Sequence, residues 1–250
     1  MVAWALVAAA LAGIVIALVY CYVAYRFSRR PVSSNTQMAR AQFTIFWYGL
    51  GVTAALSALE AALAAAGALS LSIAVTVGLV GVLIDCVFLW AIVDVLIYLY
   101  TGRYYFAGVA VLYGLFYVAA LYYTILERPY GVVIRAGIPT LLVEPVTVHA
   151  LVAVVDVGLV FPEFIVAVLY LSLLRRTRDR TQRFRIAVVG LSIIAWFGLT
   201  FFYPSSTAAE TFERAFLQLV PALLALVAYL PPEWMRTRFR ILGIDASTPQ

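Results

Sequence analysis

The amino-acid sequence predicts an all-α membrane protein, a bundle of seven transmembrane helices with the N-terminus outside and the C-terminus inside. Hydrophobic residues make up 65% of the chain and charged residues 12%, and the mean hydropathy is +1.02. Ordinary soluble domains are far more polar. A transmembrane helix needs about 20 mainly apolar residues. Seven such runs follow one another along the chain, at residues 2–25, 41–66, 73–100, 104–126, 148–174, 184–203 and 211–230.

The orientation follows from the cationic residues, which are all arginine. Basic loops are retained on the cytoplasmic side of a membrane. Fourteen of the seventeen arginines come after the first, third, fifth or seventh run: Arg26, Arg29, Arg30, Arg40, Arg103, Arg175, Arg176, Arg178, Arg180, Arg183, Arg185, Arg236, Arg238 and Arg240. We assign the other three, Arg128, Arg135 and Arg214, to the remaining connectors. We therefore expect a multi-pass protein of the cell membrane with an outer N-terminus.

The domain organisation is simple, with one helical membrane domain at residues 1–230 and a cytoplasmic amphipathic tail at residues 231–250. Pro231 and Pro232 end the last helix. Beyond them, arginines alternate with Trp234 and other apolar residues. This pattern is typical of a segment that lies at the membrane interface, either as an anchor or as a docking segment for a cytoplasmic partner.

The longest connector, at residues 127–147, contains prolines and glycines but also apolar stretches. Long loops that keep apolar residues usually fold over another part of the protein. We expect either a lid over the outer mouth of the bundle or a strand pair at the interface.

Catalytic and cofactor chemistry has little support in the sequence. His149 is the single histidine, so a histidine-based metal site, haem ligation or a Ser-His-Asp triad lacks partners. Its position at the outer start of the fifth run allows a role in pH sensing or simple contact with lipid headgroups. Lysine is absent, which excludes a covalently bound retinal. We expect no enzyme activity, no metal and no cofactor.

The net charge of +5 does not indicate nucleic-acid binding. The arginines lie beside the ends of the apolar runs, where they can meet anionic lipid headgroups. The lipid bilayer is therefore the expected partner of this charge.

Ionisable residues inside the apolar runs are the main candidates for function, because they are costly at membrane depth. The five acids are Glu60, Asp85, Asp94, Asp156 and Glu163, and we expect no arginine within a run to pair with them. Asp85 and Asp94 are nine residues apart and should point to opposite sides of the third helix, which would then be central. The acids could be protonated and structural, form a proton or cation pathway, or line a polar ligand pocket.

Two tyrosines and two prolines complete the candidates within the apolar runs. Tyr113 and Tyr117 share one face of the fourth run, where they either pack in the core or line a pocket. Pro162 and Pro221 are expected to kink their helices.

Short motifs resemble the seven-helix sensor regions that precede many prokaryotic histidine kinases. They are Phe88-Leu-Trp followed by Tyr100-Thr-Gly-Arg103, and Phe46-Trp-Tyr-Gly with the later Glu60. The resemblance implies a membrane sensor. We expect no kinase or other output domain after these motifs, so a sensor of this kind would signal through a separate cytoplasmic protein.

We therefore expect a non-enzymatic, receptor-like protein with a ligand pocket in the outer half of the bundle. Its partner would meet the inner segment that contains Arg175, Arg176, Arg178 and Arg180. A small transporter or proton-coupled translocator that uses the buried acids is the alternative. A third possibility is an accessory subunit of a larger membrane complex.

Overall fold

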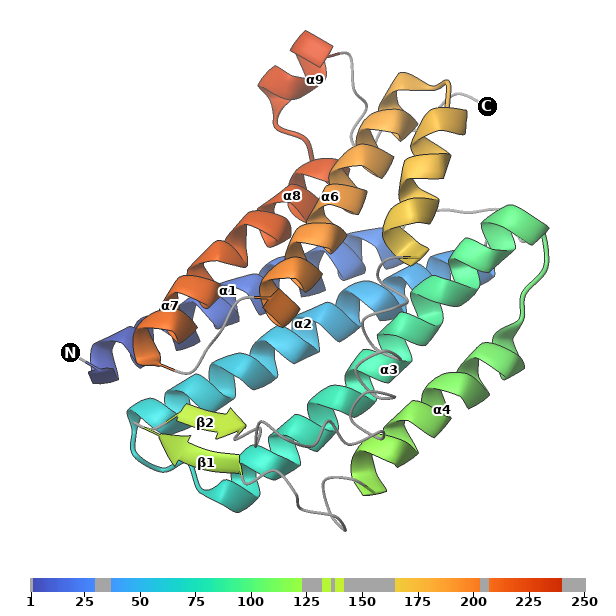
Figure 1. The fold of residues 1–250 in the computed structure, drawn as a ribbon. Helices are drawn as coiled ribbons and strands as arrows, with labels where there is room; N and C mark the ends of the chain where they lie inside the picture. Colours follow the sequence, from blue (N-terminus) through green and yellow to red (C-terminus); the bar gives the residue numbers. More distant parts are fainter. Residues whose placement is uncertain are drawn as a thin grey trace.

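The computed structural model describes residues 2–29, 37–122, 132–135, 138–141, 165–202 and 207–239. Helices dominate this part of the chain (Figure 1). Five of them are long and apolar enough to cross a membrane: Ala3–Ser28, Gln37–Ala65, Leu71–Thr101, Arg180–Thr200 and Ala208–Tyr229. The expected helical membrane fold is confirmed at this level.

The first two helices, α1 (Val2–Ser28) and α2 (Gln37–Ala65), pack closely along their length. Small residues make this approach possible, because a Cβ added at Gly13 of α1 would lie 2.9 Å from the Cβ of Ala58 on α2. Helices in lipid commonly associate through such small residues.

Helix α3 (Leu71–Thr101) has a defined cap at each end. The Ser70 hydroxyl accepts a hydrogen bond from the Ile73 N–H at the start, as N-caps do. Gly102 ends the helix in the left-handed conformation, with φ of 70°, which glycine adopts at little cost. The tight turn that follows leads directly into α4 (Phe106–Tyr122), which packs against α3.

A second group of helices begins with helical residues 165–176. Asp179 then starts α6 (Arg180–Phe202), because its carboxylate accepts the Gln182 N–H at 2.6 Å. The last apolar run forms two helices, α7 (Ala208–Leu217) and α8 (Leu219–Tyr229), and a short helix α9 (Glu233–Phe239) follows.

The interruption between α7 and α8 falls at Gln218. Pro221 explains it, because proline has no N–H to donate to the carbonyl four residues earlier, that of Leu217. A kink is expected at Pro221, and the structure has this one-residue interruption three residues before it, whereas Pro162 lies outside the described residues.

A short antiparallel hairpin joins β1 (Val132–Arg135) to β2 (Ile138–Leu141). It is a strand pair within the long connector, one of the two arrangements expected there. β1 contacts α3, and the hairpin lies beside the end of the bundle where α2 ends and α3 begins (Figure 1).

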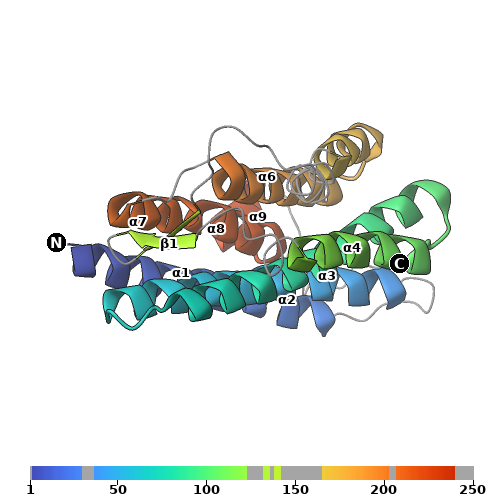
Figure 2. The ribbon, with the colours of Figure 1, turned by 60° about the horizontal axis from the view of Figure 1, so that its bottom comes forward.

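The helices form two layers (Figure 2). One layer contains α1 to α4, and α6, α7 and α8 lie over it. An aromatic cluster fills the space between the layers, with ring contacts that join α1, α2, α3, α6 and α8. Its members are Tyr20, Phe46, Trp47, Phe88, Trp196, Phe197 and Tyr229.

The observed helices follow the expected runs with shifts of a few residues at their ends. The fourth run appears as α4, which at 17 residues is shorter than the five long helices. Of the fifth run, the structure describes only the C-terminal part, as helical residues 165–176. α9 occupies the tail where an interfacial segment was expected.

Candidate ligand-binding site

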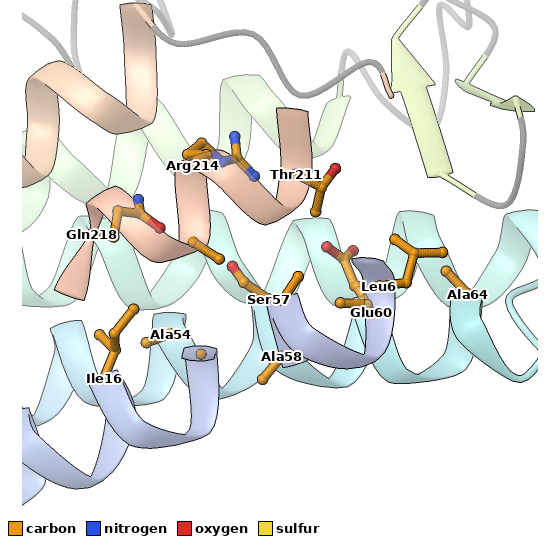
Figure 3. A pocket seen from close by; sticks show the side chains of 14 residues that line it. Leu6, Ile16, Ala54, Ser57, Ala58, Glu60, Ala64, Thr211, Arg214 and Gln218 are labelled. Atoms are coloured by element: carbon orange, nitrogen blue, oxygen red, sulfur yellow. The ribbon is translucent and has the colours of Figure 1, made fainter. Parts of the chain in front are cut away.

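A cavity of about 160 Å³ lies between α1, α2 and α7 (Figure 3). It is located at the end of the bundle where α1 begins, α2 ends and α7 begins. Its walls are mostly small apolar side chains. The lining residues are Leu6, Ala9, Gly13, Ile16, Ala54, Ser57, Ala58, Glu60, Ala61, Ala64, Thr211, Arg214, Ala215 and Gln218.

Two opposite charges line this cavity, Glu60 from α2 and Arg214 from α7. Both residues are half-buried, and the carboxylate and the guanidinium attract one another electrostatically. Figure 3 shows the Glu60 carboxylate directed from α2 toward α7, the helix that carries Thr211 and Arg214. Charges in a partly buried site interact more strongly than they do in water.

Arg214 corrects one expectation from the sequence. We had assigned it to a connector and expected no arginine within a run to pair with an acid. Because the capped helix α7 begins at Ala208, Arg214 lies inside the candidate span Ala208–Tyr229 and faces Glu60. The sequence did contain the signal, since residue 214 falls within the last apolar run.

Three uncharged polar residues complete the cavity lining, namely Ser57, Thr211 and Gln218. The Gln218 amide donates a hydrogen bond of 3.1 Å to the Thr200 hydroxyl on α6. These residues are not among the candidates predicted from the sequence. Their importance depends on the packing of α7 against α1 and α2, which single polar side chains do not reveal.

Asp94 lies outside the cavity and has a structural environment. It is fully buried, and one carboxylate oxygen accepts a hydrogen bond from the Gln42 amide of α2. The other oxygen accepts the Tyr105 N–H at 2.8 Å, just before α4 begins. Asp94 thus ties α2 and the turn before α4 to α3.

Asp85 also contacts α2, because the Thr53 hydroxyl donates to its carboxylate at 3.0 Å. Asp85 and Asp94, which are expected to point to opposite sides of the helix, thus both accept hydrogen bonds from α2, and Asp94 accepts another from the turn before α4. In the C-terminal half of α3, Phe88 packs against Phe46 of α2 and Phe197 of α6.

The remaining candidates do not gather at the cavity. Tyr113 is buried and packs edge-to-face on Phe116, with ring centroids 5.9 Å apart, and Tyr117 is half-buried. Neither tyrosine lines the cavity. His149, Asp156 and Glu163 lie outside the described residues.

At the other end of the bundle, the four arginines proposed for partner contact surround the connection between helical residues 165–176 and α6. Arg175, Arg178 and Arg180 are exposed. Arg176 stacks over the Tyr100 ring of α3, with its guanidinium carbon 5.2 Å from the ring centroid. All four residues are therefore exposed to solvent, and Arg176 also helps to hold the segment against α3 through its ring contact.

Metal chemistry has no candidate centre in the part of the chain that the structure describes, where no three or more His, Cys, Asp or Glu side chains cluster. Comparisons with protein-family models, with curated proteins and with solved structures found no match to this chain. The cavity between α1, α2 and α7, with Glu60 and Arg214 in its lining, is the candidate site.

Proposed function

We propose that this protein is a seven-helix, receptor-like membrane sensor with its N-terminus outside and its C-terminus inside. A small ligand would bind in the cavity in the outer half, and the inner arginine segment would pass the signal to a separate cytoplasmic protein. The observation that carries the proposal is a cavity with two opposite charges at the end of the bundle farthest from the arginine-rich end.

The arrangement of the first and last spans supports this orientation. α1 and α7 both begin beside the cavity, and the Phe27 ring near the end of α1 packs on Tyr229 at the end of α8. The two spans are therefore parallel, and an odd number of crossings must connect them. α4 and the helix that ends at residue 176 would supply the two crossings needed to reach seven.

The charge distribution supports it too. Apart from Arg135 in β1 and Arg214 in the cavity lining, the described arginines gather at the end of the bundle opposite the cavity, where they flank the inner ends of several helices. Cationic loops favour the cytoplasmic side. The cavity would consequently open toward the outer half of the membrane.

A physical connection runs from the cavity toward the inner segment. Gln218 lines the cavity and donates to Thr200 of α6, and the Ser192 hydroxyl of α6 donates to the Pro221 carbonyl of α8 at 2.7 Å. α6 begins at Arg180, within the arginine segment. A ligand that shifts α7 at its junction with α8 would therefore move α6 as well.

The described residues favour sensing over transport. Below the cavity, the aromatic cluster is closely packed, with Tyr20 only 5.6 Å from Trp47 and 5.3 Å from Trp196 between ring centroids. Asp85 and Asp94 are both engaged in hydrogen bonds with α2. This packing argues against a polar route through the described part of the bundle.

The proposal is tested by filling the cavity with a larger side chain and measuring hydrogen–deuterium exchange in the inner arginine segment. Ala215→Leu adds volume to the cavity lining on α7, and the matched control Ala209→Leu adds it at an exposed position of the same helix. In lipid nanodiscs, hydrogen–deuterium exchange at residues 175–185 should change in Ala215→Leu only. Adding Gln218→Leu should remove the change, and identical exchange in all variants would contradict the proposal.

The transport alternative is tested with proteoliposomes. We expect no dissipation of a pH or cation gradient by the purified protein. A flux that disappears in Asp85→Asn or Asp94→Asn, while the exposed variant Asp179→Asn retains it, would establish the alternative instead.

A further inference from the structure

The lining of the cavity also indicates which class of ligand it would take, an inference that rests on the proposed function. Most of the lining is apolar and consists of alanines with Leu6, Gly13 and Ile16. The side chains of these residues limit the shape of a ligand but cannot form hydrogen bonds with it. Polarity is confined to two charged residues and three uncharged ones. A ligand must therefore be recognised at a few fixed points.

The two charges approach the cavity from different helices. Among the described residues, no hydrogen bond or ion pair occupies the Glu60 carboxylate or the Arg214 guanidinium, although the two attract one another across the cavity. Partly buried charges are normally paired directly or bound to a ligand. A molecule with both charges would satisfy the two groups together.

The volume limits the size of that molecule. A cavity of about 160 Å³ is close to the roughly 150 Å³ of an engineered protein cavity that binds benzene. Drug-sized ligands occupy pockets of roughly 300 Å³ or more. The occupant would thus have about six to eight non-hydrogen atoms within the cavity.

We propose that the cavity binds a small zwitterionic group, with an ammonium at Glu60 and a carboxylate or phosphate at Arg214. A guanidinium binds either anion through two parallel hydrogen bonds. Thr211 and Gln218, on the same side of the cavity as Arg214, can add hydrogen bonds to the anion. Two sources share this chemistry, a free amino acid from outside and the headgroup of an aminophospholipid.

Thermal unfolding of the full-length protein in phosphatidylglycerol nanodiscs tests the free source. The probes are glycine and β-alanine, with ethylamine and acetate as single-charge controls. The zwitterions should raise the Tm with increasing concentration, and the single-charge compounds should have no effect at the same concentrations. Phosphatidylethanolamine added to the nanodiscs tests the lipid source, with retained lipid measured by native mass spectrometry.

Variants locate the binding. Glu60→Gln and Arg214→Gln should each weaken binding by at least about tenfold, because each leaves one ligand charge unpaired. Glu213→Gln and Arg103→Gln, on exposed residues outside the cavity, should leave it unchanged. If either cavity variant fails to fold, Glu60→Asp and Arg214→Lys replace it. These variants keep the charge but change the length or shape of the side chain, so they should weaken binding of the same ligand.

Two outcomes would overturn the inference. In the first, acetate or ethylamine alone stabilises the protein as well as the zwitterions do. In the second, neither the zwitterions nor the lipid binds in a manner that depends on Glu60 and Arg214. Neither outcome affects the sensor proposal if Ala215→Leu still alters exchange at residues 175–185.

Discussion

Asp94 shows how one buried acid can be explained by local hydrogen bonding. Its two oxygens accept from Gln42 and from the Tyr105 N–H, and its side chain is fully buried. The other Gln42 amide atom, Oε1, has no hydrogen-bond partner among the described residues. Residue 94 must therefore provide hydrogen-bond acceptors for these two donors. If the Gln42 amide rotates, its Oε1 can accept a hydrogen bond from a donor at position 94.

This environment predicts different effects for two substitutions. Asp94→Asn should be tolerated, because the Asn oxygen can accept from Tyr105 and its NH₂ group can donate to a rotated Gln42. Asp94→Leu keeps the branching at Cγ but replaces the two acceptor oxygens with larger methyl groups and leaves both donors unsatisfied, so it should lower the free energy of unfolding by at least about 1–3 kcal/mol. Unfolding by SDS in mixed micelles measures both, and a greater loss in Asp94→Asn would contradict the hydrogen-bonding role.

Glu60 illustrates the opposite case among single residues, because the cation that attracts it comes from a distant part of the chain. The sequence showed that an acid in an apolar run is a candidate for function. It could not show that Arg214, more than 150 residues later, faces it. Because Arg214 was assigned to a connector, Glu60 was expected to have no cation near it, although residue 214 lies inside the candidate span Ala208–Tyr229.

At the scale of helices, small residues decide how closely neighbours approach. A Cβ added at Gly49 of α2 would lie 2.5 Å from the Phe88 Cβ on α3, whereas a Cβ at Gly78 of α3 would meet nothing within 4 Å. The same amino acid therefore has a packing role at one position and none at the other.

The two glycines should respond in opposite directions to alanine. Gly49→Ala forces Phe88 or the α2–α3 approach to shift, and overpacking of this kind costs about 1–3 kcal/mol. Gly78→Ala should be neutral or stabilise the helix by up to about 1 kcal/mol. The same unfolding assay distinguishes them, and equal effects would show that α2 and α3 do not pack as described.

Helix ends and interruptions were partly readable from the sequence. Local chemistry explains three of them. Ser70 caps the start of α3, Gly102 ends α3 in the left-handed conformation, and Pro221 lacks the N–H that would continue the helix between α7 and α8. The layers and the cavity were not readable, because the lining comes from α1, α2 and α7, which are far apart in sequence. The spacing of apolar residues also did not predict which side of each helix packs against another helix, because nearly every side of these helices is apolar.

At the scale of the whole molecule, the arginine distribution and the parallel arrangement of α1 with α7 and α8 lead to the same proposed orientation. Cysteine labelling tests it in intact cells with Cys21 and Cys86 replaced by alanine. A membrane-impermeant maleimide should label Ala68→Cys, in the exposed link between α2 and α3. Arg178→Cys should react only after permeabilisation, and the reverse pattern would invert the topology.

The central claim is that the outer cavity and the inner arginine segment are coupled through α7 and α6. Double electron–electron resonance between spin labels at Arg103→Cys and Arg178→Cys tests this most directly, in the same cysteine-free background in nanodiscs. We predict that Ala215→Leu, which fills the cavity, shifts the distance distribution, while Ala209→Leu on the exposed side of α7 leaves it unchanged. Superimposable distributions for all three proteins would contradict the coupling.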